Sequence, residues 1–535
     1  MPEGSFIWTH LEKQHRVVEK KIDWLWLILL LLAAVVLFSI NLGGLPLQDG
    51  DEATVARVAR EIWQAPADSM RWLYPTLGGE PYHQTPPLMH LLIAVAYAVG
   101  GVNEWTTRLP SAILTAISVP LLYCLGRELF RQRWAAIYSS LIYLTMLPVV
   151  RYGRLAMLDG AVAGFLILMM WFVLRSRRDL RYCLGVGISF GLICLTQGIM
   201  GVYLGAVVLV FLYWDTPRLL TSYYFWMGIF IGCLPVFCWY GFQVWNYGYP
   251  FSIDVNTSLS HIKTISNGSS ETAWYYLFEI GKWTWPWLIF LPQTIRITWD
   301  NNNLSWAKLI IVWCVVYLLI ISLISWKLPW YIFPIYPSLA LALGFQLAEM
   351  ENIPSSLGYP HAWVTSLAML AVVASAASIY FSGRTLDNLE LQIIFAAVAL
   401  TMTLAAILAA RGDKQFLKIL IWGSYISLLL LMKSNYWIWE LNTAYSVKPV
   451  AAMITKIDPA IKEIYTSFPY HRPSLDFYSD RTIIPASIGE LQYYWQYDDQ
   501  PYFLLNTSTL ENLQFKSIKV VDQVGDWQLI TKENE

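Results

Sequence analysis

The dominant pattern along the chain is a series of long apolar runs separated by shorter polar segments. A helix needs about 20 apolar residues to cross a bilayer, and thirteen runs reach or approach that length. They cover residues 22–42, 107–126, 134–150, 157–174, 182–197, 199–214, 223–245, 283–298, 306–325, 329–349, 361–381, 391–410 and 416–433. The pattern therefore predicts a polytopic α-helical membrane protein with about 13 transmembrane helices.

Other stretches depart from this pattern. Segments 43–106 and 246–282 form long loops between spans, and the apolar stretch Pro86–Gly101 is short enough to be an interfacial or re-entrant helix. Beyond Trp437, short alternating runs predict strands, and Lys448–Ile457 reads as a helix. The expected strands are Glu463–Ser467, Leu475–Tyr478, Thr482–Pro485, Tyr502–Leu505, Ser517–Val521 and Trp527–Thr531. We therefore expect a transmembrane domain over residues 1–436 and a soluble α/β domain over residues 437–535.

Composition and charge narrow the function classes. Only 14% of the residues are charged and 56% are hydrophobic, whereas soluble domains average about 25% charged residues, so a soluble enzyme is excluded for most of the chain. A net charge of −1 argues against a nucleic-acid partner. With a cytoplasmic N-terminus, the basic clusters at 13–21, 127–133 and 175–181 lie on the inner face, as membrane topology favours. This orientation places both long loops and the C-terminal domain outside, in the periplasm of a bacterial inner membrane.

The first outer loop opens with three carboxylates in four residues. Asp49, Asp51 and Glu52 directly follow the first span, and charges at a membrane surface are costly unless they serve a function. The alternative is a solvated helix N-terminus whose acids face the helix dipole. Thr54–Trp63 then reads as an amphipathic helix along the surface.

Other polar residues lie in the remaining outer segments. Arg154 and Asp159 flank one short turn, with a simple ion pair as the alternative, and Lys327 could merely extend to the headgroups. The further candidates are Tyr82, His83, Gln84, His261 and Tyr331. Because acids, arginines, a histidine and a lysine converge on one face, the pattern predicts an active site for an anionic, membrane-embedded substrate.

Several of these residues lie in motifs that resemble a known family. The run Asp51–Glu61 is similar to the first-loop signature of C-type glycosyltransferases, polytopic enzymes that use polyprenyl-phosphate sugars. The resemblance is narrower to the bacterial branch of aminoarabinose transferases and protein O-mannosyltransferase-like enzymes. Supporting matches are Pro86-Pro87-Leu88, Arg108-Leu109-Pro110-Ser111, Arg154 with Leu158-Asp159, Lys327-Leu328-Pro329-Trp330-Tyr331, Ser446-Val447-Lys448-Pro449, Arg472-Pro473-Ser474-Leu475-Asp476-Phe477-Tyr478 and Gly525-Asp526-Trp527.

This resemblance implies inverting transfer of one sugar from an undecaprenyl-phosphate-type donor to an envelope acceptor, such as lipid A, a glycan or a protein. Asp51 matches the acid regarded as catalytic in the family, and Asp159 matches its second acid. Lys327 and Tyr331 match the region that meets the lipid-linked phosphate, and His261 falls in the second outer loop. A flippase for a lipid-linked sugar is the alternative, although transporters place polar groups near the midplane in repeated halves.

At two places the sequence departs from the family pattern and has neutral residues where the family usually has charged ones. The usual Glu-Lys before Pro-Pro is Gln84-Thr85 here, and the usual Thr-Lys-Gly is Thr196-Gln197-Gly198. Loss of the glutamate weakens the case for a divalent metal, and no other cofactor is implied. The substrate-binding candidates are Asp49, Glu52, Tyr82, His83, Gln84, Arg154, His261, Lys327 and Tyr331.

Overall fold

The computed structural model describes residues 3–248, 272, 274–324, 327–351, 358–382, 388–442, 446–458, 461, 463–498, 500–513, 515 and 517–533. The chain forms two compact units. Unit 1 comprises Met1–Leu42, His83–Leu88 and Leu109–Trp437. Unit 2 comprises Gly43–Tyr82, Met89–Arg108 and Ile438–Glu535.

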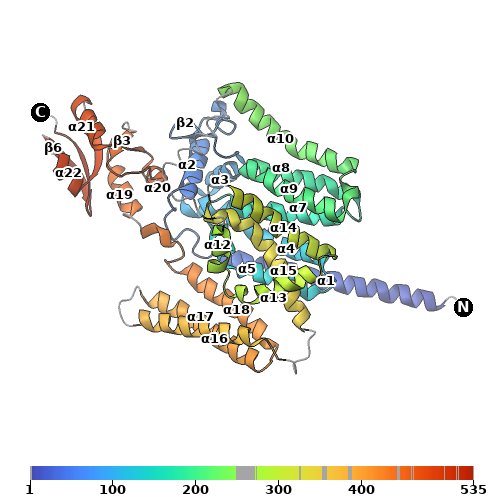
Figure 1. Ribbon diagram of the computed structural model, residues 1–535. Helices are drawn as coiled ribbons and strands as arrows, with labels where there is room; N and C mark the ends of the chain where they lie inside the picture. Colours follow the sequence, from blue (N-terminus) through green and yellow to red (C-terminus); the bar gives the residue numbers. More distant parts are fainter. Residues whose placement is uncertain are drawn as a thin grey trace. The chain divides into compact units, whose positions relative to one another are not determined.

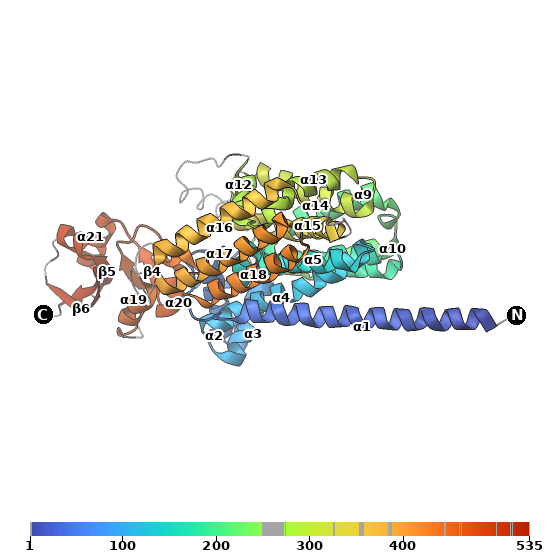
Figure 2. The ribbon, with the colours of Figure 1, turned by 90° about the horizontal axis from the view of Figure 1, so that it is seen from below.

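Long apolar helices dominate the described chain, as the hydropathy pattern predicts. Nine of them within the described residues are long and apolar enough to cross a membrane. They are α1 (Glu3–Ser39), α4 (Glu104–Leu129), α8 (Cys183–Gln197) with η2 (Leu180–Tyr182), α10 (Tyr223–Tyr247), α14 (Ser305–Leu323), α15 (Tyr336–Glu351) with η5 (Pro329–Ile335), α16 (His361–Phe381), α17 (Asn388–Ala410) and α18 (Gln415–Lys433). The polytopic helical fold is therefore confirmed, and α16, α17 and α18 lie side by side in both views (Figures 1 and 2).

The other four expected spans take different forms. The run at 134–150 is a pair of helices, α5 (Arg133–Leu144) and α6 (Leu147–Arg154), bent by 59°. Pro148 lies in the first turn of α6, where proline is well accommodated, but it could not continue a helix from α5. The runs at 157–174 and 199–214 are the 17-residue helices α7 (Asp159–Arg175) and α9 (Ile199–Asp215).

The run at 283–298 is not one continuous helix. It follows α12 (Tyr275–Trp283) and consists of a 3-10 turn, η4 (Trp287–Phe290), and the ten-residue helix α13 (Leu291–Asp300). Prolines at 286 and 292 limit a longer helix here, since each lacks a backbone donor. The count of about 13 transmembrane helices therefore stays a prediction.

Helices α8 and α10 approach each other through glycines. A Cβ atom on Gly187 would overlap the carbonyl group of Gly228, and one on Gly191 would overlap the carbonyl oxygen of Gly232. Only residues without a side chain allow two helix backbones to come so close. These glycines serve helix packing, and the two helices run next to each other in Figure 1.

A five-stranded sheet forms the core of unit 2, with strand order β4-β3-β5-β7-β6. The strands are β3 (Glu463–Thr466), β4 (Thr482–Pro485), β5 (Tyr502–Asn506), β6 (Ile518–Val524) and β7 (Trp527–Lys532). β3 is parallel to both β4 and β5, whereas β7 is antiparallel to β5 and β6. The small soluble α/β domain that the alternating runs predicted is therefore present.

Helices cover both faces of this sheet. Leu504 of β5 packs with α19 (Val447–Ile454), whereas its neighbours Phe503 and Leu505 pack with α21 (Ile488–Tyr497). Successive side chains of a strand point to opposite faces, so β5 contributes to a core on each side. The Leu475–Tyr478 strand was a wrong prediction, because this segment is helix α20 (Pro473–Ser479), and Pro473 at its first turn was the available signal.

Most of the first loop folds as part of unit 2, whereas His83–Leu88 belongs to unit 1. It contains α2 (Asp51–Gln64), the short hairpin β1 (Thr76–Leu77) and β2 (Glu80–Pro81), and the 13-residue apolar helix α3 (Leu88–Gly100). The amphipathic helix predicted at Thr54–Trp63 is thus confirmed as α2. Its residue Arg57 donates to the carbonyl oxygen of Asp476 at 3.3 Å, which joins the loop to α20.

Candidate active site

Asp51 is the first residue of α2, directly after a sharp change in backbone direction. Gly50 adopts φ +90°, a conformation that favours glycine. The turn is fixed because the Ala53 amide donates to the Gln48 carbonyl at 3.2 Å and the Thr54 amide donates to the Gly50 carbonyl at 3.0 Å. The Asp51 side chain is exposed, and its carboxylate has no hydrogen bond or ion pair within the described residues.

The two neighbouring acids are engaged in ion pairs. Asp49 accepts hydrogen bonds from Arg472 Nε at 2.7 Å and from the Ser474 amide at 3.2 Å. Glu52 is almost fully buried and forms a two-point ion pair with Arg108, at 2.8 Å from Nε and 3.0 Å from Nη2. The carboxylates that looked alike in sequence therefore differ, and Asp51 alone of these three offers an uncommitted oxygen.

Arg108 also fixes the chain that leads to Asp51. Its Nη1 donates to the Leu45 carbonyl and its Nη2 to the Pro46 carbonyl, both at 2.8 Å. The Gln48 amide completes the arrangement by donating to Glu52 Oε2 at 2.7 Å. Arg108 is thus a positioning residue that sequence reasoning missed, although a charge at the start of an apolar span was a signal for it.

Surrounding protein shifts the acidity of Asp51. Desolvation disfavours the charged carboxylate and raises its pKa to about 6. The residue keeps an exposed surface, so a reactant can reach it. A carboxyl group with a pKa close to physiological pH can accept and return a proton, which is the property of a general base.

The second acid lies in unit 1. Asp159 begins α7, is 3% exposed, and accepts a hydrogen bond from Gln197 Nε2 at 3.1 Å. Gln197 is the last residue of α8. The departure noted in the sequence, Gln197 where the resemblance implies a lysine, therefore places a neutral amide beside this acid.

The segment after α14 packs beside Asp159's helix. η5 lies against α7 and α14, and the Tyr331 carbonyl accepts a hydrogen bond from the buried Tyr317 hydroxyl at 2.8 Å. The ring of Trp330 lies 6.4 Å from the ring of Tyr152. Tyr152 belongs to α6 and precedes Arg154 by two residues. Lys327, immediately before η5, is half-buried. The structure therefore brings the Lys327–Tyr331 segment and the start of α7 into one region of unit 1.

The contacts of Arg154 are with backbone carbonyl groups and an aromatic ring of the protein itself. It is fully buried, and its guanidinium donates to the Leu37 carbonyl at 3.1 Å and to the Ile40 carbonyl. These groups lie at the end of α1, where carbonyls lack intrahelical partners and a cation is favourable. The guanidinium also lies 4.5 Å from the ring centroid of Trp437. Arg154 thus caps a helix.

The remaining candidates are dispersed. Tyr82 is buried in unit 2 with its ring 5.6 Å from that of His90, whereas His83 of unit 1 stacks edge-on with Tyr247 at 4.7 Å. Gln84 is exposed. His261 lies outside the described residues. Within the described chain, no group of three or more His, Cys, Asp or Glu side chains could hold a metal ion.

Comparisons with known proteins bear on this arrangement. A family model described as "Dolichyl-phosphate-mannose-protein mannosyltransferase" matches residues 84–240. "Undecaprenyl phosphate-alpha-4-amino-4-deoxy-L-arabinose arabinosyl transferase 1" of Pseudomonas fluorescens is 25% identical over 320 residues, 56% of this chain and 55% of that protein. The similarly named transferase of Shewanella sediminis is 23% identical over 517 residues, 91% of each chain. The chain thus spans only about half of the first relative.

Solved structures match over nearly the full length. ArnT from Cupriavidus metallidurans, solved in the apo state and bound to undecaprenyl phosphate, superposes with a TM-score of 0.75 at 18% identity, covering 95% of this chain and 97% to 98% of ArnT. The chain therefore shares the fold of ArnT. The resemblance seen in its sequence motifs is confirmed, and the archaeal oligosaccharyltransferase AglB shares the architecture more distantly, with a TM-score of 0.55.

The similar proteins also bear on the cellular setting. The apolar helices and the bacterial relatives support a protein that crosses a bacterial inner membrane several times. Of the similar structures, one of ArnT was solved with undecaprenyl phosphate and that of AglB with a dolichol-phosphate.

Proposed function

We propose that this protein is a C-type glycosyltransferase that moves one sugar from a polyprenyl-phosphate donor to an acceptor in the cell envelope, such as lipid A, a glycan or a protein. The relatives are named for undecaprenyl phosphate 4-amino-4-deoxy-L-arabinose, which makes that donor the first to test. The N-terminus is cytoplasmic, and reaction takes place at the periplasmic face, where the first loop and the soluble domain lie.

The observation that carries the proposal is the state of Asp51. It is an exposed carboxylate on a rigid turn, free of hydrogen bonds within the described chain, beside two acids that are committed to arginines. Asp51 accepts the proton as the acceptor hydroxyl attacks the anomeric carbon. The new bond joins that oxygen to the sugar, the bond from the sugar to the phosphate oxygen breaks, and polyprenyl phosphate leaves. This single displacement inverts the anomeric configuration.

The sequence resemblance is our ground for also proposing roles for two residues of unit 1. Asp159, held by Gln197, orients the sugar and favours positive charge at the anomeric carbon. Lys327 stabilises the phosphate as it gains charge, because a fixed cation lowers the energy of a developing anion. Arg154 is left out of the phosphate site, since its guanidinium is buried against carbonyl groups of α1.

The pH dependence of transfer tests the role of Asp51. Desolvation raises its pKa to about 6, and only the ionised form accepts a proton, so activity is lost as the pH falls through that value. We expect kcat/KM to be about tenfold lower near pH 5 than near pH 8. The measurement is transfer of a radiolabelled sugar by the purified enzyme in lipid vesicles. A flat profile over this range would contradict a general-base role.

Replacement of Lys327 with Gln tests how the donor phosphate is held. Loss of this cation should raise KM for the lipid-linked sugar by about tenfold, the effect expected for one charge-assisted contact. The matched control is Lys433→Gln, which removes an exposed lysine at the end of α18. Equal donor KM values for the two variants would remove Lys327 from the proposal.

A further inference from the structure

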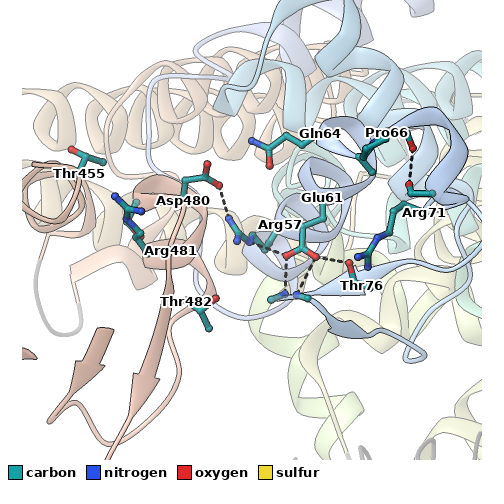
Figure 3. Close-up of a pocket in the computed structure, with 15 residues that line it drawn as sticks. Arg57, Glu61, Gln64, Pro66, Arg71, Thr76, Thr455, Asp480, Arg481 and Thr482 are labelled. Carbon is teal, nitrogen blue, oxygen red and sulfur yellow. Dashed lines mark hydrogen bonds and ion pairs between the residues drawn. The ribbon is translucent and has the colours of Figure 1, made fainter. Parts of the chain in front are cut away.

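A polar cleft of about 620 Å³ lies within unit 2. It is bounded by α2, the β1–β2 hairpin and the turn between α20 and β4 (Figure 3). Sites for small molecules typically measure about 300–1,000 Å³. The lining is mostly polar and contains no aromatic side chain, and neither Asp51 nor Asp159 contributes to it. The cleft is therefore distinct from the proposed catalytic residues.

Two carboxylates in the cleft wall are already neutralised. Glu61 accepts hydrogen bonds from Arg57 Nε at 3.1 Å, the Thr76 hydroxyl at 2.6 Å and the Gly78 amide at 2.7 Å. Asp480 forms ion pairs with Arg57 at 3.0 Å and with Arg60 at 3.1 Å. These contacts make the wall rigid, and they remove the repulsion that free carboxylates would exert on an anion.

Arg71 adds a positive charge that the wall does not compensate. It is half-buried, lines the cleft, and has no hydrogen bond or ion pair within the described residues. Its turn is fixed, because the amides of Leu73 and Tyr74 donate to the Met70 carbonyl at 2.9 and 3.0 Å. Met70 itself adopts φ +51°, a conformation that side chains disfavour and that is kept where surrounding contacts demand it.

Two further polar side chains of the cleft lining are uncommitted. Gln64 and Thr482 line the cleft, and Figure 3 shows both side chains beside it. Neither side chain has a hydrogen bond within the described chain. The amide and hydroxyl supply both donors and acceptors, as the hydroxyl groups of a sugar require. Gly79 at φ +88° has open space where a side chain would be, so the hairpin leaves room for a ligand.

We propose that this cleft binds an anionic saccharide, a sugar that carries a phosphate or a carboxylate. Arg71 pairs with the anionic group, since guanidinium presents a planar fork suited to two-point recognition of either oxyanion. Gln64 and Thr482 bind the ring hydroxyls. The ligand is either the headgroup of a lipid-anchored glycan or a free sugar phosphate, which share this chemistry. The proposal does not depend on sugar transfer, because binding here needs no catalytic residue.

Equilibrium binding to the purified full-length chain in detergent tests the inference. The probes are glucose 6-phosphate, glucose, inorganic phosphate and lipid A in mixed micelles. We expect glucose 6-phosphate or lipid A to bind, and Arg71→Gln to weaken that binding by about tenfold or more. Thr482→Val, which keeps the side-chain volume, should weaken it less. The control Lys519→Gln removes one exposed positive charge from β6 of the same unit and should leave affinity unchanged.

Each outcome decides between explanations. Binding of lipid A alone assigns the site to a membrane-anchored glycan, whereas binding of glucose 6-phosphate alone assigns it to a soluble one. Equal binding by Arg71→Gln and Lys519→Gln overturns the inference, as does absence of binding by either saccharide. Inorganic phosphate that binds as tightly as glucose 6-phosphate would overturn it too, by leaving only an anion site. If sugar transfer fails while binding persists, the proposed function is wrong and the cleft assignment stands.

Discussion

Replacement of Asp51 with Asn should lower sugar transfer by about 10²–10⁴-fold, the range measured when a positioned general base is lost. Asparagine keeps the size and hydrogen-bonding shape of the side chain but cannot accept a proton. Because Asp51 is exposed and makes no hydrogen bond within the described chain, this change removes chemistry without removing a structural contact. The measurement is the rate of transfer of a radiolabelled sugar from the polyprenyl-phosphate donor.

Two comparisons separate catalysis from structure. Asp68→Asn removes an exposed acid from η1 (Ala67–Ser69) in the same loop and should keep full activity. The Asp51→Asn protein should match the wild type in thermal midpoint, and should bind undecaprenyl phosphate unchanged. If the Asp51→Asn protein transferred sugar within a few fold of the wild-type rate, another group would have to accept the proton, and the proposed mechanism would have to be given up.

Local patterns predicted most of the helices and strands. Runs such as those of α14 and α17 are long, apolar and free of breakers, so hydropathy alone locates them. Two predictions of secondary structure were wrong at positions where a proline begins a new helix. Pro148 separates α5 from α6, and Pro473 begins a helix where alternation suggested a strand. Both prolines were visible in the sequence. Because proline is accommodated in the first turn of a helix but not in its interior, each could have been used to predict the start of a new helix.

The partners of the candidate acids could not be predicted in the same way. Glu52 pairs with Arg108, 56 residues away, and Asp49 pairs with Arg472, 423 residues away. A single sequence contains no information about which distant charges meet after folding. The sequence therefore located a cluster of three carboxylates correctly but could not show that only Asp51 is uncommitted among them, a distinction that depends on tertiary contacts.

The buried pair of Glu52 and Arg108 should have the largest effect on stability. Both side chains are 0% exposed, and breaking such a pair by removing one partner costs about 3–5 kcal/mol because it leaves an unpaired charge without solvent. Arg108→Met would strand the Glu52 carboxylate and also leave the Leu45 and Pro46 carbonyls without their donor. We expect a marked fall in the thermal midpoint of the protein in detergent.

The matched control for that variant is Arg296→Met in α13. Arg296 is 84% exposed and lies 3.9 Å from Asp300, an arrangement worth at most about 0.5 kcal/mol, so its midpoint should not change. The double variant Arg108→Met/Glu52→Gln removes both charges and should recover part of the loss. Since Arg108 holds the turn before Asp51, transfer should stay impaired even where stability returns. A thermal midpoint for Arg108→Met equal to that of Arg296→Met would contradict the assigned role. Loss of one partner from a buried ion pair must destabilise the protein more than loss of one partner from an exposed pair.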